Sequence, residues 1–206
     1  MNFDAAPGSQ QNNQEKKLDY LALLKSIENN HGRLEEIARR FLERPDLISG
    51  VKAKTDPNFR AYGVNSLGET TGGVEGKIIG QKTQGITINP DHLTEEVAVH
   101  ELVHFFSMPA LKLAYEMQQK GVLDQAPEEM KKYALNIQRA FDYAASKGYR
   151  STNSHSMTHD IKEFAVNFTN EQSAEQLKQL GIYQGLVDSF FRYYNSIQTP
   201  DPSASI

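Results

Sequence analysis

The sequence predicts an α+β fold in which a small, mostly antiparallel sheet is followed by a predominantly helical half. Its 206 residues suffice for one domain with a sizeable core and are too few for two of ordinary size. Apolar residues recur at helical spacing near the N-terminus and throughout the second half, whereas residues from about 47 to 89 form short alternating pieces. We therefore expect one domain over residues 16–198, with disordered segments at 1–15 and 199–206, where core-forming residues are scarce.

The N-terminal part of the domain reads as two helices followed by short strands. Apolar residues at helical spacing trace a first helix (Leu18, Leu21, Leu24 and Ile27) and, after the break "NNHG", a second (Leu34, Ile37, Ala38, Phe41 and Leu42) that stops at Pro45. Four pieces then alternate in the manner of strands: "LISGVKA", "FRAYGVN", "GKIIGQ" and "GITIN". Clusters such as "SLGETTGG" separate them, so we expect loops there and hairpins between the strands.

Helical patterns resume after Asn89-Pro90. Thr94, or Asp91 before it, can cap a helix through "EEVAVHELVHFFS", and Pro109 is expected in the first turn of a separate helix. A long amphipathic helix ends near Gly148; its apolar positions are Met130, Tyr133, Ala134, Ile137, Ala140, Phe141 and Ala144. Two more helices are expected around 158–169 and 183–197.

Composition excludes several classes of protein. The net charge is −4 and the 22 Lys and Arg residues are scattered, so we expect no nucleic-acid partner. The chain has no cysteine, so any metal must be held by His, Asp, Glu or Tyr. No apolar run approaches the roughly 20 residues of a membrane span, and the N-terminus lacks the hydrophobic region of a signal peptide. We expect a soluble protein, either cytoplasmic or exported without a cleaved signal peptide.

The stretch "HELVH" carries the clearest chemical signal. On a helix, His100 and His104 lie about 40° apart in projection and about 6 Å apart along the axis, so both imidazoles can reach one ion. Glu101 is turned about 100° from His100, in the position from which a glutamate takes a proton from zinc-bound water. One Zn²⁺ per chain requires a third protein ligand. The pattern that continues HExxH with xxGxxH is absent, because Ser107 and Ala110 occupy those positions.

The third ligand is therefore expected farther along, in "SHSMTHDIKEFAVNF". The helical pattern there leaves His159, Asp160, Glu163 and Asn167 on the face opposite an apolar stripe. Glu163 is our first choice of ligand, followed by His159, Asp160 and His155, because carboxylates and imidazoles both suit zinc. Asn167, one turn after Glu163, is a candidate hydrogen-bond partner for a metal-binding imidazole.

Hydrolysis of a peptide bond also requires a donor for the developing oxyanion. His155, His159 and Tyr149 all precede the expected ligand closely. We rank His155 first, as a catalytic residue beside Glu101, because its imidazole has no other assigned role.

These residues together resemble the zincin metallopeptidases, within the branch whose third ligand is a glutamate on a later helix. "HELVH" matches two ligands and the base, "EFAVN" matches the Glu ligand followed by Asp or Asn, and "GKIIGQKTQGITIN" is similar to the zincin edge strand. The spacing looks nearest to small bacterial zincins, including lethal-factor-like domains and effector proteases delivered into host cells. The lethal-factor type carries a Tyr seven residues before the Glu, where this chain has Ser156.

The resemblance implies a zincin-like single domain and a zinc-dependent endopeptidase, with a cleft between the sheet and the helical half. Its protein or peptide substrate would bind as an extended strand along residues 85–89, and Glu101 would act as general base. Two alternatives come from other classes. One is a non-catalytic helical interaction module with a structural His pair and the aromatic helix "LVDSFFRYYNSIQ" as partner surface. The other is a metal hydrolase that acts on a non-peptide bond.

Overall fold

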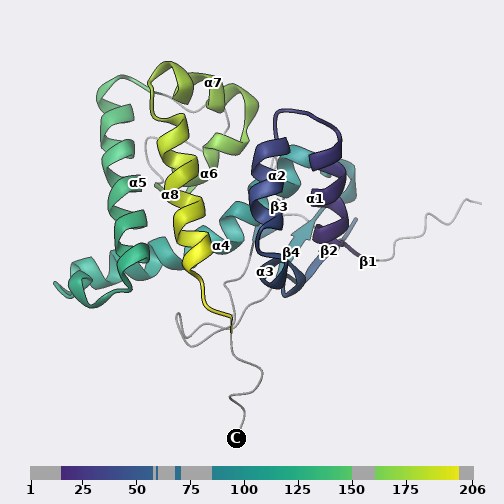
Figure 1. Ribbon diagram of the computed structural model, residues 1–206, viewed down its shortest axis with the longest axis horizontal. Coiled ribbons are helices and arrows are strands. Elements are labelled where there is room, and N and C mark those ends of the chain that lie inside the picture. The colour runs from purple at the N-terminus through teal and green to yellow at the C-terminus, as the bar shows by residue number, and fades with distance from the viewer. Residues whose placement is uncertain (1–14, 58, 60–67, 71–84, 150–160, 200–206) are drawn as a thin grey trace, which may run out of the picture.

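The computed structural model describes residues 15–57, 59, 68–70, 85–149 and 161–199, and within them the fold is mixed α+β (Figure 1). The strands are β1 (Lys16–Lys17), β2 (Ala53–Thr55), β3 (Gly68–Thr70) and β4 (Ile86–Ile88). The helices are α1 (Tyr20–Asn29), α2 (Glu35–Leu42), α3 (Pro45–Ser49), α4 (Glu95–Gln119), α5 (Glu128–Ser146), α6 (Ile161–Val166), α7 (Glu171–Gln179) and α8 (Tyr183–Ser196). Short 3-10 turns lie at η1 (Pro90–His92), η2 (Leu123–Gln125) and η3 (Asn167–Thr169).

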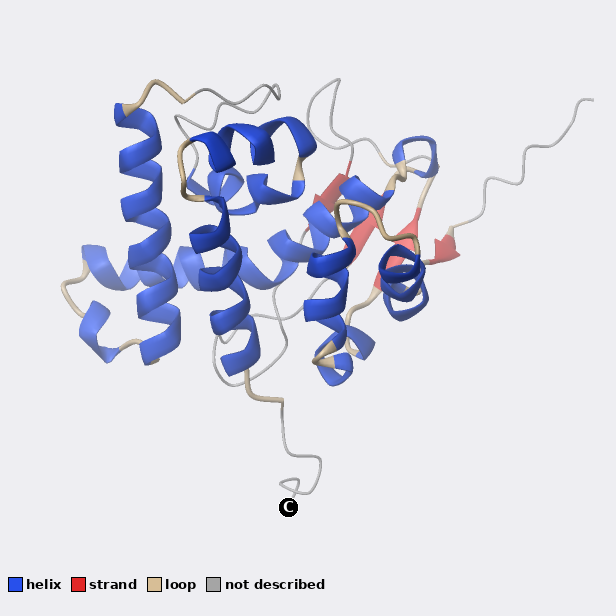
Figure 2. Ribbon diagram, turned by 45° about the horizontal axis from the view of Figure 1, so that its top comes forward, coloured by secondary structure: helices blue, strands red, loops and turns tan. Residues whose placement is uncertain are grey.

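The four strands form one small sheet at one end of the molecule, shown in red in Figure 2. Their order is β1-β2-β4-β3, with antiparallel pairing of β1 with β2 and of β3 with β4, and parallel pairing of β2 with β4. The expected antiparallel character therefore holds at both ends of the sheet, but the central pair is parallel. Ile86 and Ile88 of β4 are buried while Thr87 between them is partly exposed, the alternation expected of a strand with one face on the core.

Three of the strand predictions need correction. The piece "LISGVKA" begins in helix α3, because Pro45 stands at its first turn, and only its last residue, Ala53, belongs to a strand. The expected loop "SLGETTGG" contains strand β3. Most of "FRAYGVN" and all of "GKIIGQ" lie outside the described residues.

The third correction concerns the edge of the sheet. The segment 85–89 was expected to be an edge strand, but β4 lies between β2 and β3 and pairs with both. In the described sheet the strand at the edge next to β4 is β3. Gly85 fixes where the parallel pairing starts: its φ is +109°, and a Cβ there would lie 2.4 Å from the Lys52 carbonyl oxygen. That same oxygen accepts a hydrogen bond from Ile86 N at 2.8 Å.

Helix α4 is 25 residues long and connects the sheet with the helical half. Thr94 caps it as predicted, its side chain accepting a hydrogen bond from Val97 N. The predicted start of a new helix at Pro109 is wrong, because Pro109 lies inside α4. An interior proline removes a donor to the carbonyl four residues earlier, at a cost of about 3 kcal/mol. Burial of Ala110, Leu111 and Ala114 beyond it offsets that cost.

The helical half is built around a cluster of aromatic side chains. Phe41 of α2 makes edge contacts with Phe191 and Tyr194 of α8, with ring centroids 5.0 and 5.1 Å apart, and packs on Phe106 of α4. Four aromatic residues in the second half of α8 are buried: Phe190, Phe191, Tyr193 and Tyr194. These side chains are part of the core, so they do not form the partner surface that the interaction-module hypothesis assumed. Helices α5 and α8 run side by side (Figure 1).

The remaining predicted helices are present, with small differences in their bounds. The helix expected around 158–169 appears as α6 followed by η3 from residue 161, and the helix expected at 183–197 is α8. Helix α5 ends at Ser146, and Gly148 adopts a φ of 73° just beyond it. Helix α7 was not predicted. The disordered segments expected at 1–15 and 199–206 lie outside the described residues, apart from Glu15 and Thr199.

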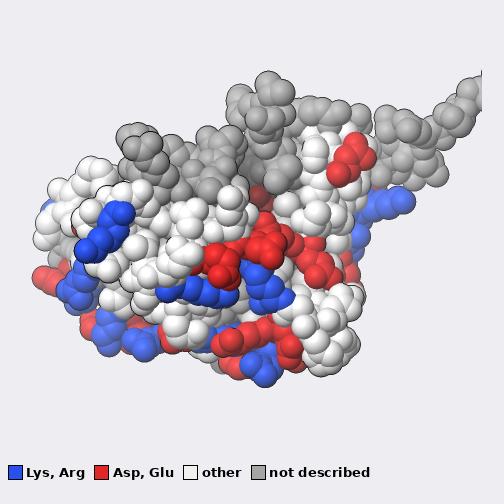
Figure 3. Space-filling model, turned by 90° about the horizontal axis from the view of Figure 1, so that it is seen from above, with Lys and Arg blue, Asp and Glu red and all other residues white. Residues whose placement is uncertain are grey.

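No helix within the described ranges combines the length and the apolar character that a membrane span needs. On the face shown in Figure 3, Asp and Glu side chains gather near the middle and are interleaved with separate Lys and Arg side chains.

Candidate metal centre

Helix α4 presents the two histidines of "HELVH" on one face. The ring centroids of His100 and His104 are 4.7 Å apart and the rings are nearly perpendicular, at 80°. Their helix is capped at Thr94 and its apolar residues Ala98, Val99, Leu102 and Val103 are fully buried. The backbone that carries both imidazoles is therefore held firmly against the core.

Glu163, in the first turn of α6, brings a carboxylate to the same point. Its Oε1 lies 3.3 Å from His104 Nε2 and its Oε2 lies 3.7 Å from His100 Nε2. One atom from each of the three side chains can be chosen so that all lie within 4.8 Å of one another. Donor atoms about 2.0–2.2 Å from one tetrahedral zinc ion are about 3.3–3.6 Å apart. The two carboxylate–imidazole distances are close to this range, so the three side chains could hold a single ion after small adjustments. The structure thus gathers the three residues that the sequence predicted as ligands.

The cluster is partly open to solvent. The side chains of Glu163 and His100 are 27% and 19% exposed, whereas His104 is 5% exposed. Burial alone would raise the pKa of the Glu163 carboxyl, but hydrogen bonds from His100 and His104 in their protonated form, together with their charges, outweigh burial and lower it strongly. A carboxyl group held ionised in this way is in the form that binds a metal ion.

Thr169 of η3 fixes which nitrogen of His100 faces the cluster. The Thr169 hydroxyl donates its proton to the Val166 carbonyl oxygen at 2.7 Å. A hydroxyl has one proton, so towards His100 Nδ1, 3.1 Å away, Thr169 Oγ1 can act only as acceptor. The hydrogen of a neutral His100 therefore sits on Nδ1, and the lone pair of Nε2 points to the side of Glu163. This is the tautomer that metal binding through Nε2 requires.

The supporting role that the sequence suggested for Asn167 falls to Thr169. The prediction assumed that the helix of Glu163 continues, which would bring the residue four positions later to the same face. The α-helix ends at Val166 and the chain continues as the tighter turn η3, so Thr169 comes to face His100. Asn167 is buried in that turn. The only sequence signal for Thr169 was a hydroxyl residue close behind the predicted ligand.

Glu101 is buried on α4 and does not belong to the group of converging ligand atoms found among the described residues. Its carboxylate is near Tyr20 of α1: burial raises the pKa of the Tyr20 hydroxyl well above its usual value, and the charge of Glu101 raises it further. Tyr20 donates a hydrogen bond to the Ala98 carbonyl oxygen at 2.9 Å, which ties α1 to the helix of the site.

The candidates for an oxyanion donor separate into two groups. The Tyr149 hydroxyl donates a hydrogen bond to the Ser173 carbonyl oxygen at 3.4 Å, and burial raises its pKa. Its ring packs against Phe164, so it supports α6 from the side of the core. His155 and His159, with the alternative ligand Asp160, lie outside the described residues, as does Ser156.

Comparisons with protein-family models, with curated proteins and with solved structures find no match for this chain. The functional interpretation therefore depends on the geometry and chemistry of the site itself.

Proposed function

We propose that this protein is a zinc-dependent endopeptidase, with a zincin-like domain in which His100, His104 and Glu163 hold the metal. The observation that carries the proposal is the convergence of these three side chains from two helices, with donor atoms within 4.8 Å of one another. Two imidazoles and one carboxylate are a donor set that suits zinc and leaves a fourth position for water or substrate.

The protein's own groups account for the proton transfers of peptide hydrolysis. Bound zinc would supply Lewis-acid polarisation of the scissile carbonyl and would lower the pKa of the attacking water. Glu101, next to His100 and outside the ligand group, is the base that takes a proton from that water. It then returns the proton to the amine of the departing peptide, so the carboxylate is regenerated in each turnover.

The substrate is proposed to be an extended segment of a protein or peptide. Residues 85–89 cannot supply a free strand edge, because β4 pairs with β2 and β3. Strand β3 is at the edge of the described sheet and packs against α4, the helix that carries the ligands. Backbone pairing of the substrate is therefore assigned to β3 in the proposal, in place of residues 85–89.

A structural role for the histidines is the second candidate, and one observation favours it. The carboxylate of Glu163 lies 3.3 and 3.7 Å from the two Nε2 atoms, so the three side chains can also form an ion-paired cluster without a metal. In that case the cluster would connect α4 with α6, and the protein would bind no zinc.

Zinc content and proteolysis, measured on the same preparations, test the proposal. The zinc content of the reconstituted full chain is determined by atomic emission, and cleavage is followed with fluorescein-labelled casein. The variants are Glu101→Gln and Glu163→Ala. Glu95→Gln is the matched control, because Glu95 is an exposed glutamate on the same helix whose side chain accepts a hydrogen bond from Asn30.

We expect one zinc per chain for the wild type, for Glu101→Gln and for Glu95→Gln, and little for Glu163→Ala. Cleavage should fall by about 100-fold or more in Glu101→Gln, since general acid–base catalysis contributes about 10²–10⁴-fold, and should be unchanged in Glu95→Gln. A wild-type chain that takes up no zinc would support the structural role instead. Full zinc uptake with no cleavage of casein or of a mixed-sequence peptide library would argue against the endopeptidase.

A further inference from the structure

We infer that Arg33 and Glu96 form a clamp that positions Thr169 and, through it, the imidazole of His100. The inference rests on the proposed function insofar as His100 is a metal ligand. Arg33 and Glu96 are positioning residues in this scheme. Neither was singled out by the sequence patterns.

The clamp begins at the backbone of Thr169. Its carbonyl oxygen accepts a hydrogen bond from Arg33 Nη2 at 2.6 Å, while its hydroxyl accepts one from His100 Nδ1 at 3.1 Å. Arg33 Nη2 also contacts Glu96 Oε2 at 2.8 Å. Thr169 is fully buried, so its two polar groups depend on these protein partners. The guanidinium thus holds the same residue that orients the imidazole.

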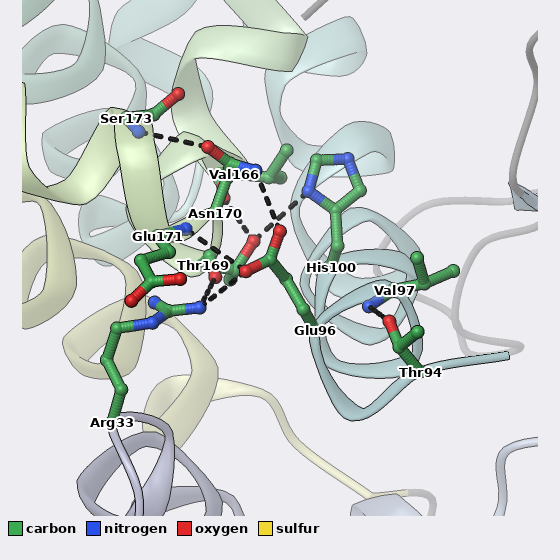
Figure 4. A network of polar contacts seen from close by, with 10 residues as sticks. All are labelled: Arg33, Thr94, Glu96, Val97, His100, Val166, Thr169, Asn170, Glu171 and Ser173. Atoms are coloured by element: carbon green, nitrogen blue, oxygen red, sulfur yellow. Dashed lines mark hydrogen bonds and ion pairs between the residues drawn. The ribbon is translucent and has the colours of Figure 1, made fainter. Parts of the chain in front are cut away.

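Glu96 gathers the contacts on the other side of the clamp (Figure 4). Its Oε1 accepts a hydrogen bond from Asn170 Nδ2 at 2.7 Å, and its Oε2 accepts one from Glu171 N at 3.1 Å in addition to the contact with Arg33. Glu96 lies one turn before His100 on α4. One helix therefore carries the imidazole and the carboxylate that holds the turn beside it.

Two of the residues that Glu96 contacts, Asn170 and Glu171, form the start of α7. Asn170 caps this helix by accepting a hydrogen bond from Ser173 N at 2.9 Å, and Glu96 accepts from the first backbone N–H of the helix, at Glu171. A carboxylate is favoured at a helix N-terminus, where the backbone dipoles carry partial positive charge. Charge and hydrogen bonding therefore both hold α7, and Thr169 just before it, against α4.

A second arginine, on the helix that follows Arg33 in the chain, provides a matched comparison. Arg40 of α2 contacts Asp188 of α8 at 2.7 Å, and its side chain is 21% exposed, close to the 23% of Arg33. Both pairs connect distant parts of the chain through one guanidinium and one carboxylate. Arg40 contacts α8 at Asp188. Arg33, in contrast, also contacts Thr169, the residue that is hydrogen-bonded to His100. A general structural role would make the two pairs equivalent, and a positioning role would not.

Loss of the clamp should act on the direction of the imidazole. Without Arg33 or Glu96, the turn 169–171 loses one or more of its ties to α4, and Thr169 Oγ1 is no longer held at hydrogen-bond distance from His100 Nδ1. The ring is then freer to rotate and to carry its hydrogen on Nε2, which blocks that nitrogen as a ligand. Outer hydrogen bonds of this kind typically change metal affinity by about 10–100-fold.

The test uses the full chain with the variants Arg33→Met, Glu96→Gln, Thr169→Val and Thr169→Ser, and with Arg40→Met as control. Three quantities are measured: the zinc dissociation constant by competition with a chelator, the tautomer of His100 by ¹⁵N NMR, and unfolding by urea. The NMR spectra are recorded on metal-free protein at about pH 9, where an ordinary histidine is neutral. This readout needs no metal, so it separates failure of the clamp from failure of the proposed function.

In the wild type we expect His100 to carry its hydrogen on Nδ1. Thr169→Val should weaken zinc binding by about 10–100-fold and Arg33→Met and Glu96→Gln by about 10-fold, each with a mixed tautomer. Thr169→Ser should restore wild-type behaviour, and Arg40→Met should leave zinc binding and the tautomer unchanged while lowering stability. If Thr169→Val does not fold, the variants Arg33→Met and Glu96→Gln still test the inference, because both side chains are partly exposed.

The inference is overturned if Arg33→Met and Glu96→Gln bind zinc as tightly as Arg40→Met and keep the wild-type tautomer. It is also overturned if wild-type His100 carries its hydrogen on Nε2. A wild-type chain that binds no zinc, but whose His100 tautomer depends on Arg33 and Thr169, would retain the clamp and discard the zinc proposal.

Discussion

Helix α4 contributes to both the aromatic cluster around Phe41 and the polar cluster around His100, but the two clusters are held together differently. Phe106 of α4 packs among rings from α2 and α8 at centroid distances of 4.9 to 6.3 Å, in several tilted and edge-on geometries. His100, two turns earlier, depends on single directed contacts, such as the 3.1 Å hydrogen bond to Thr169. The aromatic contacts are many and weakly directional, whereas the polar contacts are few and strongly directional.

This difference shows what each region tolerates. A ring in the aromatic cluster can shift slightly and keep most of its dispersion contacts, so substitution there changes stability in proportion to the volume lost. A polar contact fails once its distance or direction is wrong, and a buried donor without an acceptor costs about 1–3 kcal/mol. The two clusters should therefore respond to mutation with separate readouts, one in stability and one in metal affinity.

The largest effect is expected for Phe41→Ala. Removal of this buried ring should lower the free energy of unfolding by about 3–5 kcal/mol, because contacts with α4 and α8 are lost and a cavity remains. Urea unfolding measures the change, and Tyr143→Ala, an exposed aromatic on α5, is the control with little effect. Zinc affinity of the folded fraction should be unchanged. A marked loss of affinity in Phe41→Ala would show that the two regions are not separate.

The second prediction breaks the polar cluster alone. His104→Asn should weaken zinc binding by more than about 100-fold, since loss of a direct ligand exceeds the usual effect of an outer hydrogen bond. His31→Asn is the matched control: His31 also lies 3.3 Å from a glutamate oxygen, but it is 81% exposed. Its φ of 51° suits asparagine. Isothermal titration with zinc compares the two; equal affinities would remove His104 from the site.

The smallest effect concerns the Arg40–Asp188 pair, which belongs to neither cluster. The hydrogen bond from Arg40 lowers the pKa of the Asp188 carboxyl below its ordinary value of 3.8. A folded-state pKa below the unfolded value stabilises the protein above that unfolded value, and the contribution is lost as the pH falls through the folded one. Asp188 is largely solvent-accessible, so Asp188→Asn should lower stability at pH 7 by only about 0.2–1 kcal/mol.

Urea unfolding of wild type and Asp188→Asn across the acid range measures this contribution. The difference between the two proteins should shrink as the pH falls below 3.8. A difference that stays constant down to the lowest pH would mean that the ion pair does not contribute.

The sequence was a good guide to elements with a regular apolar pattern. The helices α1, α2, α5 and α8 were predicted because their apolar residues recur every three to four positions and face the core. Helix α7 was missed because it has only two apolar residues, Ala174 and Leu177, too few to form a recognisable apolar stripe. Pro109 was misread because burial on both sides of it outweighs the local signal.

The candidate site was predictable only in part, for the same physical reasons. His100 and His104 are four residues apart on one helix, so local geometry places them together without knowledge of the fold. Glu163 was ranked first among four candidates in a later segment, and His159, Asp160 and His155 were kept as alternatives. Thr169 was missed because the α-helix changes to a 3-10 turn at Asn167. Arg33 contacts residues 63 and 136 positions away in the sequence, and no local sequence pattern predicts such distant contacts.

Pro109 also determines where α4 can bend. The Phe105 carbonyl has no N–H four residues later, so a hinge in this helix would form at that turn. Both histidines precede that turn, and α6, which carries Glu163, packs on α4 and, through Phe164, on Phe141 of α5. A metal bound by His100, His104 and Glu163 would hold α6 to the part of α4 before Pro109. It would therefore resist any bend of α4 at Pro109 that moved α6 together with α5.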